Sequence, residues 1–418
     1  MKTLTCTLTL ASLAGALLFP SSVAACPFCS APSLTLSEQA VQSDVFLLAE
    51  WKDGAKDMTD DGDETASTTF EVRRVLKGNF KPGQTIKMAG YNPGKAGDLF
   101  LLSGLGADVA QWDIPTPFSE KAFDYLAKAP APQTADGEKV PYRERLPYFV
   151  KHLEFPDETV ANDAYAEFAN APYEEIVAVK EEFPHEKIRA WVLDPETSPA
   201  RLGLYGLLLG LCGTEDDAAA MEKLIAKPTD EFRIGLDGVM SGYLLLKGEP
   251  ALDVVRELKL ENEFLVGENG MPVTDDAGEK IPVPFSETYA AMQAVRFMWD
   301  YGAGRIKPEH LQAAMRTLLA RPELADLAIA DLARWKDWSI MERLAKLYDE
   351  EAYQVPGIKR SIIRYFDAAT KDLPKDVKPE DTAALPEHVQ QAKEHYASIK
   401  QKDPETVKSV EQFLILVQ

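Results

Sequence analysis

The sequence predicts a multidomain α+β protein in which a small all-β barrel precedes an α-helical solenoid. Between Asp44 and about Ile114, short runs rich in valine, phenylalanine and threonine alternate with turn clusters, as in small β domains. After Pro117 nearly every run has a helical pattern with breaks at proline or glycine. We therefore predict a β domain over 44–116 and a helical domain over 117–418.

Residues 1–25 have the features of a secretory signal peptide. Lys2 is followed by the apolar run "LTLASLAGALLF", then Pro20 and the small residues "SSVAA". The apolar run is shorter than the about 20 residues that a spanning helix needs, and no later run qualifies. The sequence therefore predicts an exported chain, periplasmic or extracellular, without a transmembrane segment.

The segment 26–43 follows the signal and begins with the CPFC motif. "TLSEQ" predicts a short helix over 34–43, capped by Thr35 or Ser37. A thioredoxin-type site needs a strand before the cysteines, haem attachment needs a histidine at Ser30, and structural zinc needs two further ligands. Two interpretations of Cys26 and Cys29 remain: a local disulfide, or lipid attachment at Cys26, since "VAAC" (23–26) resembles a lipoprotein cleavage pattern.

The β domain contains strand-like runs separated by turn signals. "TFEVRRVL" partly alternates apolar and polar residues, as expected of a half-buried strand. Five short runs in about 70 residues favour a small barrel or sandwich. The predicted strands are 44–51, 66–76, 84–90, 98–105 and 108–114.

The helical domain is predicted from repeated amphipathic runs. Leu311, Met315, Leu318 and Leu319 lie on one helix face. Helices with short connections and no intervening strands favour stacked pairs of the HEAT or armadillo type, although no fixed sequence period is present. The segment 264–285 is predicted to be an irregular, hairpin-like insertion. The clearest helices are 118–129, 158–171, 214–227, 286–302, 307–320, 321–339 and 356–370.

Composition and motifs narrow the classes of function. The chain has 418 residues and a formal charge of −22, so it repels phosphate backbones, and we expect no nucleic-acid partner. Its five histidines are scattered, and no nucleophile elbow, phosphate loop, dinucleotide fingerprint or HExxH motif occurs. The sequence therefore predicts no catalytic residue, no metal site and no cofactor.

One aromatic and cationic stretch is a candidate surface site. "LARWKDWS" (332–339) brings Arg334, Trp335 and Trp338 close together in the sequence. These side chains can form a groove for a peptide or glycan. They can equally pack between stacked helices, with Arg334 paired to Asp331. Both interpretations stay open at this point.

Three stretches carry a resemblance to a known family. "CPFC" (26–29), "FEVRRVLKGNFKPGQTI" (70–86) and the tract from "RLGLYGLLLGLCGTEDDA" (201–218) to "ARWKDW" (333–338) resemble an uncharacterised family of exported bacterial proteins. The resemblance implies a small β domain before HEAT-like helices and carries no known activity. The β part also resembles the OB-like barrel of netrin-type and metalloproteinase-inhibitor modules.

The expected function follows from this architecture. We expect an exported envelope protein that acts as a protein- or peptide-binding scaffold, because a solenoid presents a long curved surface. The alternative is a hydrolase or thiol-redox accessory enzyme with a cleft between the β and helical domains. The identity of the partner is not contained in the sequence.

Overall fold

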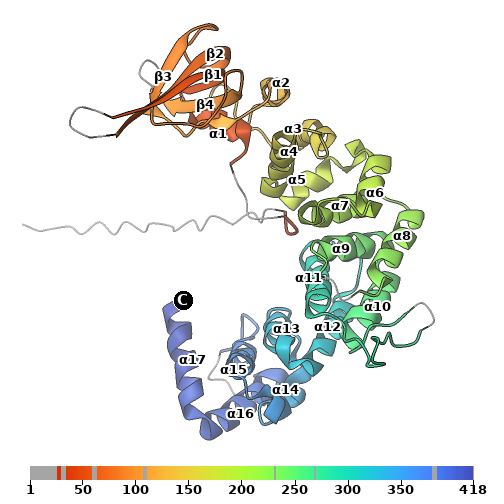
Figure 1. The fold of residues 1–418 in the computed structure, drawn as a ribbon. Helices are drawn as coiled ribbons and strands as arrows, with labels where there is room; N and C mark the ends of the chain where they lie inside the picture. The colour runs from red at the N-terminus through yellow and green to blue at the C-terminus, as the bar shows by residue number, and fades with distance from the viewer. Residues whose placement is uncertain are drawn as a thin grey trace, which may run out of the picture.

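We analysed a computed structural model of the chain (Figure 1). The predicted signal, 1–25, lies outside the described residues. The structure describes 26–29, 34–58, 64–106, 111–229, 232–267, 270–378 and 384–417.

The N-terminal unit is a six-stranded antiparallel sheet that nearly closes on itself. The strand order is β3-β2-β1-β4-β5, and β6 pairs with β4. The two end strands, β3 and β5, therefore leave the barrel open along one side. The strands are β1 (Val45–Met58), β2 (Glu64–Lys77), β3 (Thr85–Ala89), β4 (Leu99–Leu105), β5 (Gln111–Trp112) and β6 (Thr116–Pro117).

Residues 45–49 of β1 are buried on both faces of the sheet, which explains the continuous apolar sequence at the start of this strand. Val45 and Leu47 point into the barrel with Phe70 and Leu102, whereas Phe46 belongs to the core shared with the helices. A strand covered on both sides loses the simple alternation of a half-buried strand. The sheet is thus fixed to the helical region through β1.

The rest of the chain is helical, so the predicted order of a β unit followed by helices is confirmed. No helix in the described ranges is both long and apolar enough to span a membrane. The helices are α1 (Leu36–Gln42), α2 (Glu120–Lys128), α3 (Tyr142–Phe149), α4 (Glu158–Asn170), α5 (Tyr173–Ala178), α6 (His185–Leu193), α7 (Pro199–Cys212), α8 (Glu215–Ala226), α9 (Leu236–Lys247), α10 (Glu249–Val255), α11 (Phe285–Tyr301), α12 (Pro308–Thr317), α13 (Pro322–Arg334), α14 (Met341–Leu347), α15 (Pro356–Thr370), α16 (Glu387–Lys402) and α17 (Pro404–Val417).

Successive helices pack on one another along a curve (Figure 1). Helices α9, α11, α13 and α15 lie toward the inside of the curve, and α8, α10, α14 and α16 lie outside it. The predicted insertion before α11 is hairpin-like, with isolated bridges between Phe264 and Pro282 and between Thr274 and Lys280. It interrupts the helices without adding a strand to the sheet.

Glycines allow α7 and α9 to approach closely. A Cβ added at Gly206 would overlap the backbone of Val239, and one added at Gly210 would overlap the backbone of Gly242. Only residues without a Cβ allow two helix backbones to come this near. The glycine-rich run of α7 is thus the feature of the sequence that permits this close packing against α9.

Candidate functional sites

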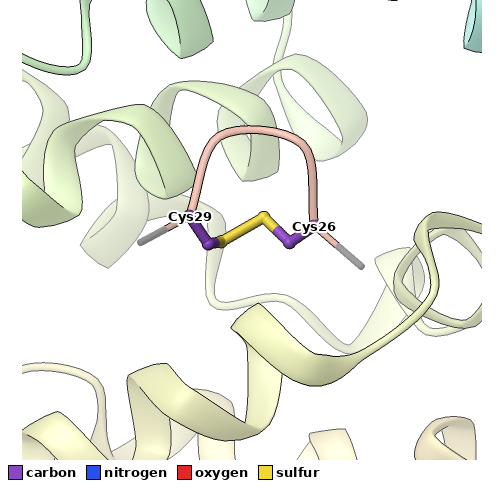
Figure 2. The surroundings of a disulfide bond; sticks show 2 residues. All are labelled: Cys26 and Cys29. Atoms are coloured by element: carbon purple, nitrogen blue, oxygen red, sulfur yellow. A yellow bond between two sulfur atoms is a disulfide. The ribbon is translucent and has the colours of Figure 1, made fainter. Parts of the chain in front are cut away.

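The CPFC motif forms a disulfide-closed loop on the inner side of the helical curve (Figures 1 and 2). The Cα atoms of Cys26 and Cys29 are 5.5 Å apart. Cys26 is only 6 % exposed, and its main-chain N–H donates a hydrogen bond of 3.2 Å to the carbonyl oxygen of Ala169, at the end of α4. The loop is therefore part of the packed structure.

An aromatic cluster holds this loop. The ring centroid of Phe28 lies 5.0 Å from that of Phe297 in α11. Tyr173, the first residue of α5, lies 5.3 Å from Phe297 and 5.0 Å from Tyr301. On α7, a Cβ added at Gly203 would lie 3.1 Å from the carbonyl oxygen of Phe28. The loop thus touches helices that are far apart in the sequence, which local sequence reasoning had missed.

The sulfur chemistry separates the two interpretations of Cys26. A sulfur engaged in a disulfide has no free thiol to form the thioether of a lipid anchor, so the two states exclude each other. Lipid attachment stays a prediction. The remaining described cysteine, Cys212, is free, and burial raises the pKa of its thiol to about 11, which keeps it protonated and unreactive near neutral pH.

Helix α1 docks on the helical region through a buried polar cluster. The main-chain N–H of Leu36 donates to Asp163 Oδ1 at 2.6 Å, and the Ser37 hydroxyl donates to Glu167 Oε1 at 2.8 Å. Arg145 of α3 donates to both oxygens of Glu167, at 2.5 and 2.6 Å, and both side chains are fully buried. These bonds fasten the segment that leads into the sheet.

The electrostatics of Asp163 and Glu167 favour a role in holding α1 in place over a role in catalytic proton transfer. Burial raises the pKa of Asp163 to about 6, and it raises the pKa of Glu167 to about 7 although Arg145 opposes the rise. Carboxyl groups with raised pKa values are common in active sites. Here, however, each carboxylate oxygen already accepts from a protein donor, because Tyr125 also donates to Asp163 Oδ2 at 2.7 Å.

The three residues predicted as a surface site lie at the corner where α13 ends, and they do not form one surface. Trp335 is 4 % exposed, and its ring stacks on that of Trp299 at 4.3 Å. Arg334 is half exposed and pairs with Asp300 at 3.1 Å and with Asp331 at 3.4 Å.

Trp338 points toward α15 and α16, away from this pair. Its indole N–H donates to Asp372 at 2.7 Å, and its ring stacks on that of His388. The chain turns between the two tryptophans because Lys336 has a φ of 54°. A binding role for these residues stays a prediction.

The open side of the barrel contains a groove that the sequence did not reveal. Its volume is about 710 Å³. Phe80 and Trp112 meet across it, with ring centroids 5.5 Å apart, while Ile114 is 86 % exposed. The groove exists because β3 and β5 do not pair with each other, and no linear sequence motif predicts which strands remain unpaired. The lining residues are 80, 85–92 and 112–115.

Within the described ranges, no group of three or more histidine, cysteine, aspartate or glutamate side chains is placed to hold a metal ion. No protein-family model matches this chain, and no curated protein matches it.

Proposed function

We propose that this chain is an exported scaffold that binds a protein or peptide, with an OB-like barrel leading into a HEAT-like helical solenoid. The observation that supports this most is the curved succession of helices with an exposed aromatic pair on an inner helix. Phe285 and Tyr289 of α11 stack at 6.1 Å and are 54 % and 37 % exposed. Exposed aromatic pairs are frequent anchors of protein interfaces.

Export is the second part of the proposal. It is supported by the signal-like composition of 1–25 and by the Cys26–Cys29 disulfide, a bond typical of oxidising compartments. Intact mass of the purified chain distinguishes the two states of Cys26. A disulfide lowers the mass by two hydrogens, whereas lipid attachment adds a diacylglyceryl group.

A crosslinking experiment in cells tests the binding role. A photoreactive residue replaces Tyr289 on α11, and a matched control replaces Lys223, which is exposed on the outer helix α8. We expect the label at position 289 to trap one discrete protein and the label at 223 to trap none. Fractionation should find the chain outside the cytoplasm without residues 1–25. Retention in the cytoplasm, or identical labelling from both positions, would contradict the proposal.

The thiol-redox alternative has one observation in its favour, the disulfide itself. Against it, Cys26 is buried and its main-chain N–H is already engaged, whereas thiol exchange needs an accessible sulfur. Insulin reduction provides the test. Activity in the wild type that disappears when Cys26 and Cys29 are both changed to serine would replace the binding role by a redox role.

A further inference from the structure

We propose that the groove between β3 and β5 binds an extended, acidic peptide segment of a partner protein as an added β-strand. This inference rests on the proposed function, since it assigns a surface and a ligand chemistry to the binding role. The occupant is a segment with apolar side chains at alternate positions and a carboxylate that reaches Lys87.

The hydrogen bonds of β3 show which of its backbone groups face the groove. The N–H of Gly90 donates to the carbonyl of Ala66 at 2.8 Å, and the N–H of Val72 donates to the carbonyl of Gln84 at 2.8 Å. Since bonding alternates along an antiparallel pair, even-numbered residues of β3 bond to β2. The N–H and C=O groups of the odd-numbered residues 85, 87 and 89 therefore face the groove.

On the opposite side of the groove, β5 also has backbone groups that do not bond to its neighbour β4. The N–H of Asp113 donates to the carbonyl of Ser103 in β4 at 2.9 Å. By the same alternation, the backbone groups of Trp112 point away from β4 and toward the groove. A strand added along β3 would gain main-chain partners from the groove-facing groups of that strand, on the side left open between β3 and β5.

The apolar walls favour a peptide with alternating side chains. Ile114, at 86 % exposure, lies on one side of the groove, and Phe80 and Trp112 are only partly buried. An added strand directs every second side chain toward the interior, where Ile86 and Met88 of β3 already point. Aliphatic or aromatic residues at those positions would cover this surface.

The positive charge of Lys87 on β3 predicts which side chain the bound peptide presents on its outward face. Lys87 is exposed at the centre of β3 and has no hydrogen bond or ion pair among the described residues. The carboxylate of Asp113, also in the groove, instead accepts from the Ser103 hydroxyl at 2.7 Å. An aspartate or glutamate of the bound strand opposite Lys87 would complete a cross-strand pair of opposite charge.

The same lysine argues against a second copy of this chain as the occupant. Two β3 strands paired about a two-fold axis through their centres would place Lys87 opposite its equivalent, and like charges in that position are destabilising. Lysine at a strand edge commonly prevents such self-pairing.

Peptide selection tests the ligand chemistry. A displayed library of random twelve-residue peptides is selected on the full chain, and hydrogen exchange then locates each bound peptide. We expect the selected peptides to share alternating apolar residues and an acidic residue, and to slow exchange of the amides at 85, 87 and 89 about tenfold.

Three variants sharpen the result. Lys87→Glu should change the selected preference from acidic to basic residues. Ala89→Pro removes one groove-facing N–H without breaking a β2–β3 bond and should weaken binding about fivefold to tenfold. The control Lys151→Glu makes the same charge change in the helical region. It should alter neither the preference of the selected peptides nor the strength of their binding. Unchanged exchange in β1 and β2 verifies that each variant is folded.

Each contrary outcome has its own meaning. Peptides that protect the inner helices instead of β3 would overturn this inference and leave the proposed function standing. Selection of no peptide would overturn it too, while the crosslink at position 289 tests the wider role independently. Self-association that protects β3 without any peptide would show that a second copy occupies the groove.

Discussion

Asp163 shows how one buried carboxyl can make the attachment of the N-terminal segment depend on pH. Its pKa rises from 3.8 to about 6 mainly because it is buried, against the bonds from Leu36 and Tyr125. Arg145 lowers this pKa and Glu38 raises it further. The folded chain thus binds the proton more tightly than the unfolded chain. The contribution of Asp163 to the free energy of unfolding should therefore fall as pH rises from about 4 to about 6, and Glu167, whose pKa is raised to about 7, should extend the fall to about pH 7.

The change Asp163→Asn should remove the part of this pH dependence that comes from Asp163 and leave the part that comes from Glu167. Because a pKa raised from 3.8 to about 6 corresponds to about 3 kcal/mol, the wild type should lose up to about that much more stability between about pH 4 and pH 7 than the variant does. Urea unfolding at several pH values measures the difference.

Asp124→Asn is the matched control for this experiment. The pKa of Asp124 is lowered by its hydrogen bond from Arg74, so its contribution is lost only as pH falls below the ordinary carboxyl range. Equal slopes for the wild type and Asp163→Asn would contradict the assignment.

Gly242 is one of the glycines at which α7 and α9 approach too closely to accommodate a side chain. A Cβ at this position would overlap the backbone of Gly206, so Gly242→Ala should lower the free energy of unfolding by about 2 kcal/mol or more. Gly357→Ala in α15 is the control. There an added Cβ meets only the movable carboxylate of Asp326, at 3.3 Å, and the helix can gain up to about 1 kcal/mol. Thermal unfolding that ranks the two variants in the opposite order would refute this packing argument.

At the level of elements, the disulfide loop acts as a connector between helices. It contacts the end of α4 through Ala169, α7 through Gly203 and α11 through Phe297. A four-residue disulfide loop restrains the unfolded chain little. The contribution of the loop should therefore come mostly from the Phe28 ring that it presents to the helices.

The change Phe28→Ala tests this connector. Loss of a partly buried aromatic ring should lower the free energy of unfolding by about 1–3 kcal/mol and should expose the disulfide, which dithiothreitol would then reduce faster. Pro27→Ala is the control, since Pro27 is exposed in the same loop. Identical reduction rates in the wild type and both variants would show that the loop is not held by the ring.

At the level of the whole molecule, the helices follow an open curve and do not close into a sphere (Figure 1). A compact chain of about 390 residues has a radius of gyration of about 21 Å. We expect solution X-ray scattering to give a value clearly above this, because successive helices contact mainly their neighbours along the curve. A value at the compact limit would exclude the extended arrangement.

The order of the elements was predictable from the sequence, and the candidate sites were predictable only in part. The helix over 34–43 is present as α1, and of the two caps that the sequence offered, Thr35 and Ser37, Thr35 caps the helix. The cysteine pair was identified, but its burial was not. For Arg334, Trp335 and Trp338, spacing left two interpretations open. The positive φ of Lys336, which turns Trp338 away from Trp335, depends on the surrounding packing.

The strand predicted over 44–51 continues to Met58 and the helix predicted over 321–339 ends at Arg334, so the sequence did not determine where every element ends. What the sequence by itself determined is the order of the elements and the type of the main segments. Those features depend on apolar period, capping residues and breakers within a few positions of one another. Only the tertiary structure decided that Leu36 meets Asp163 and Ser37 meets Glu167, 127 and 130 positions away, and that β3 and β5 leave a groove. The physical reason is that these contacts depend on the path of the whole backbone, which no local pattern encodes.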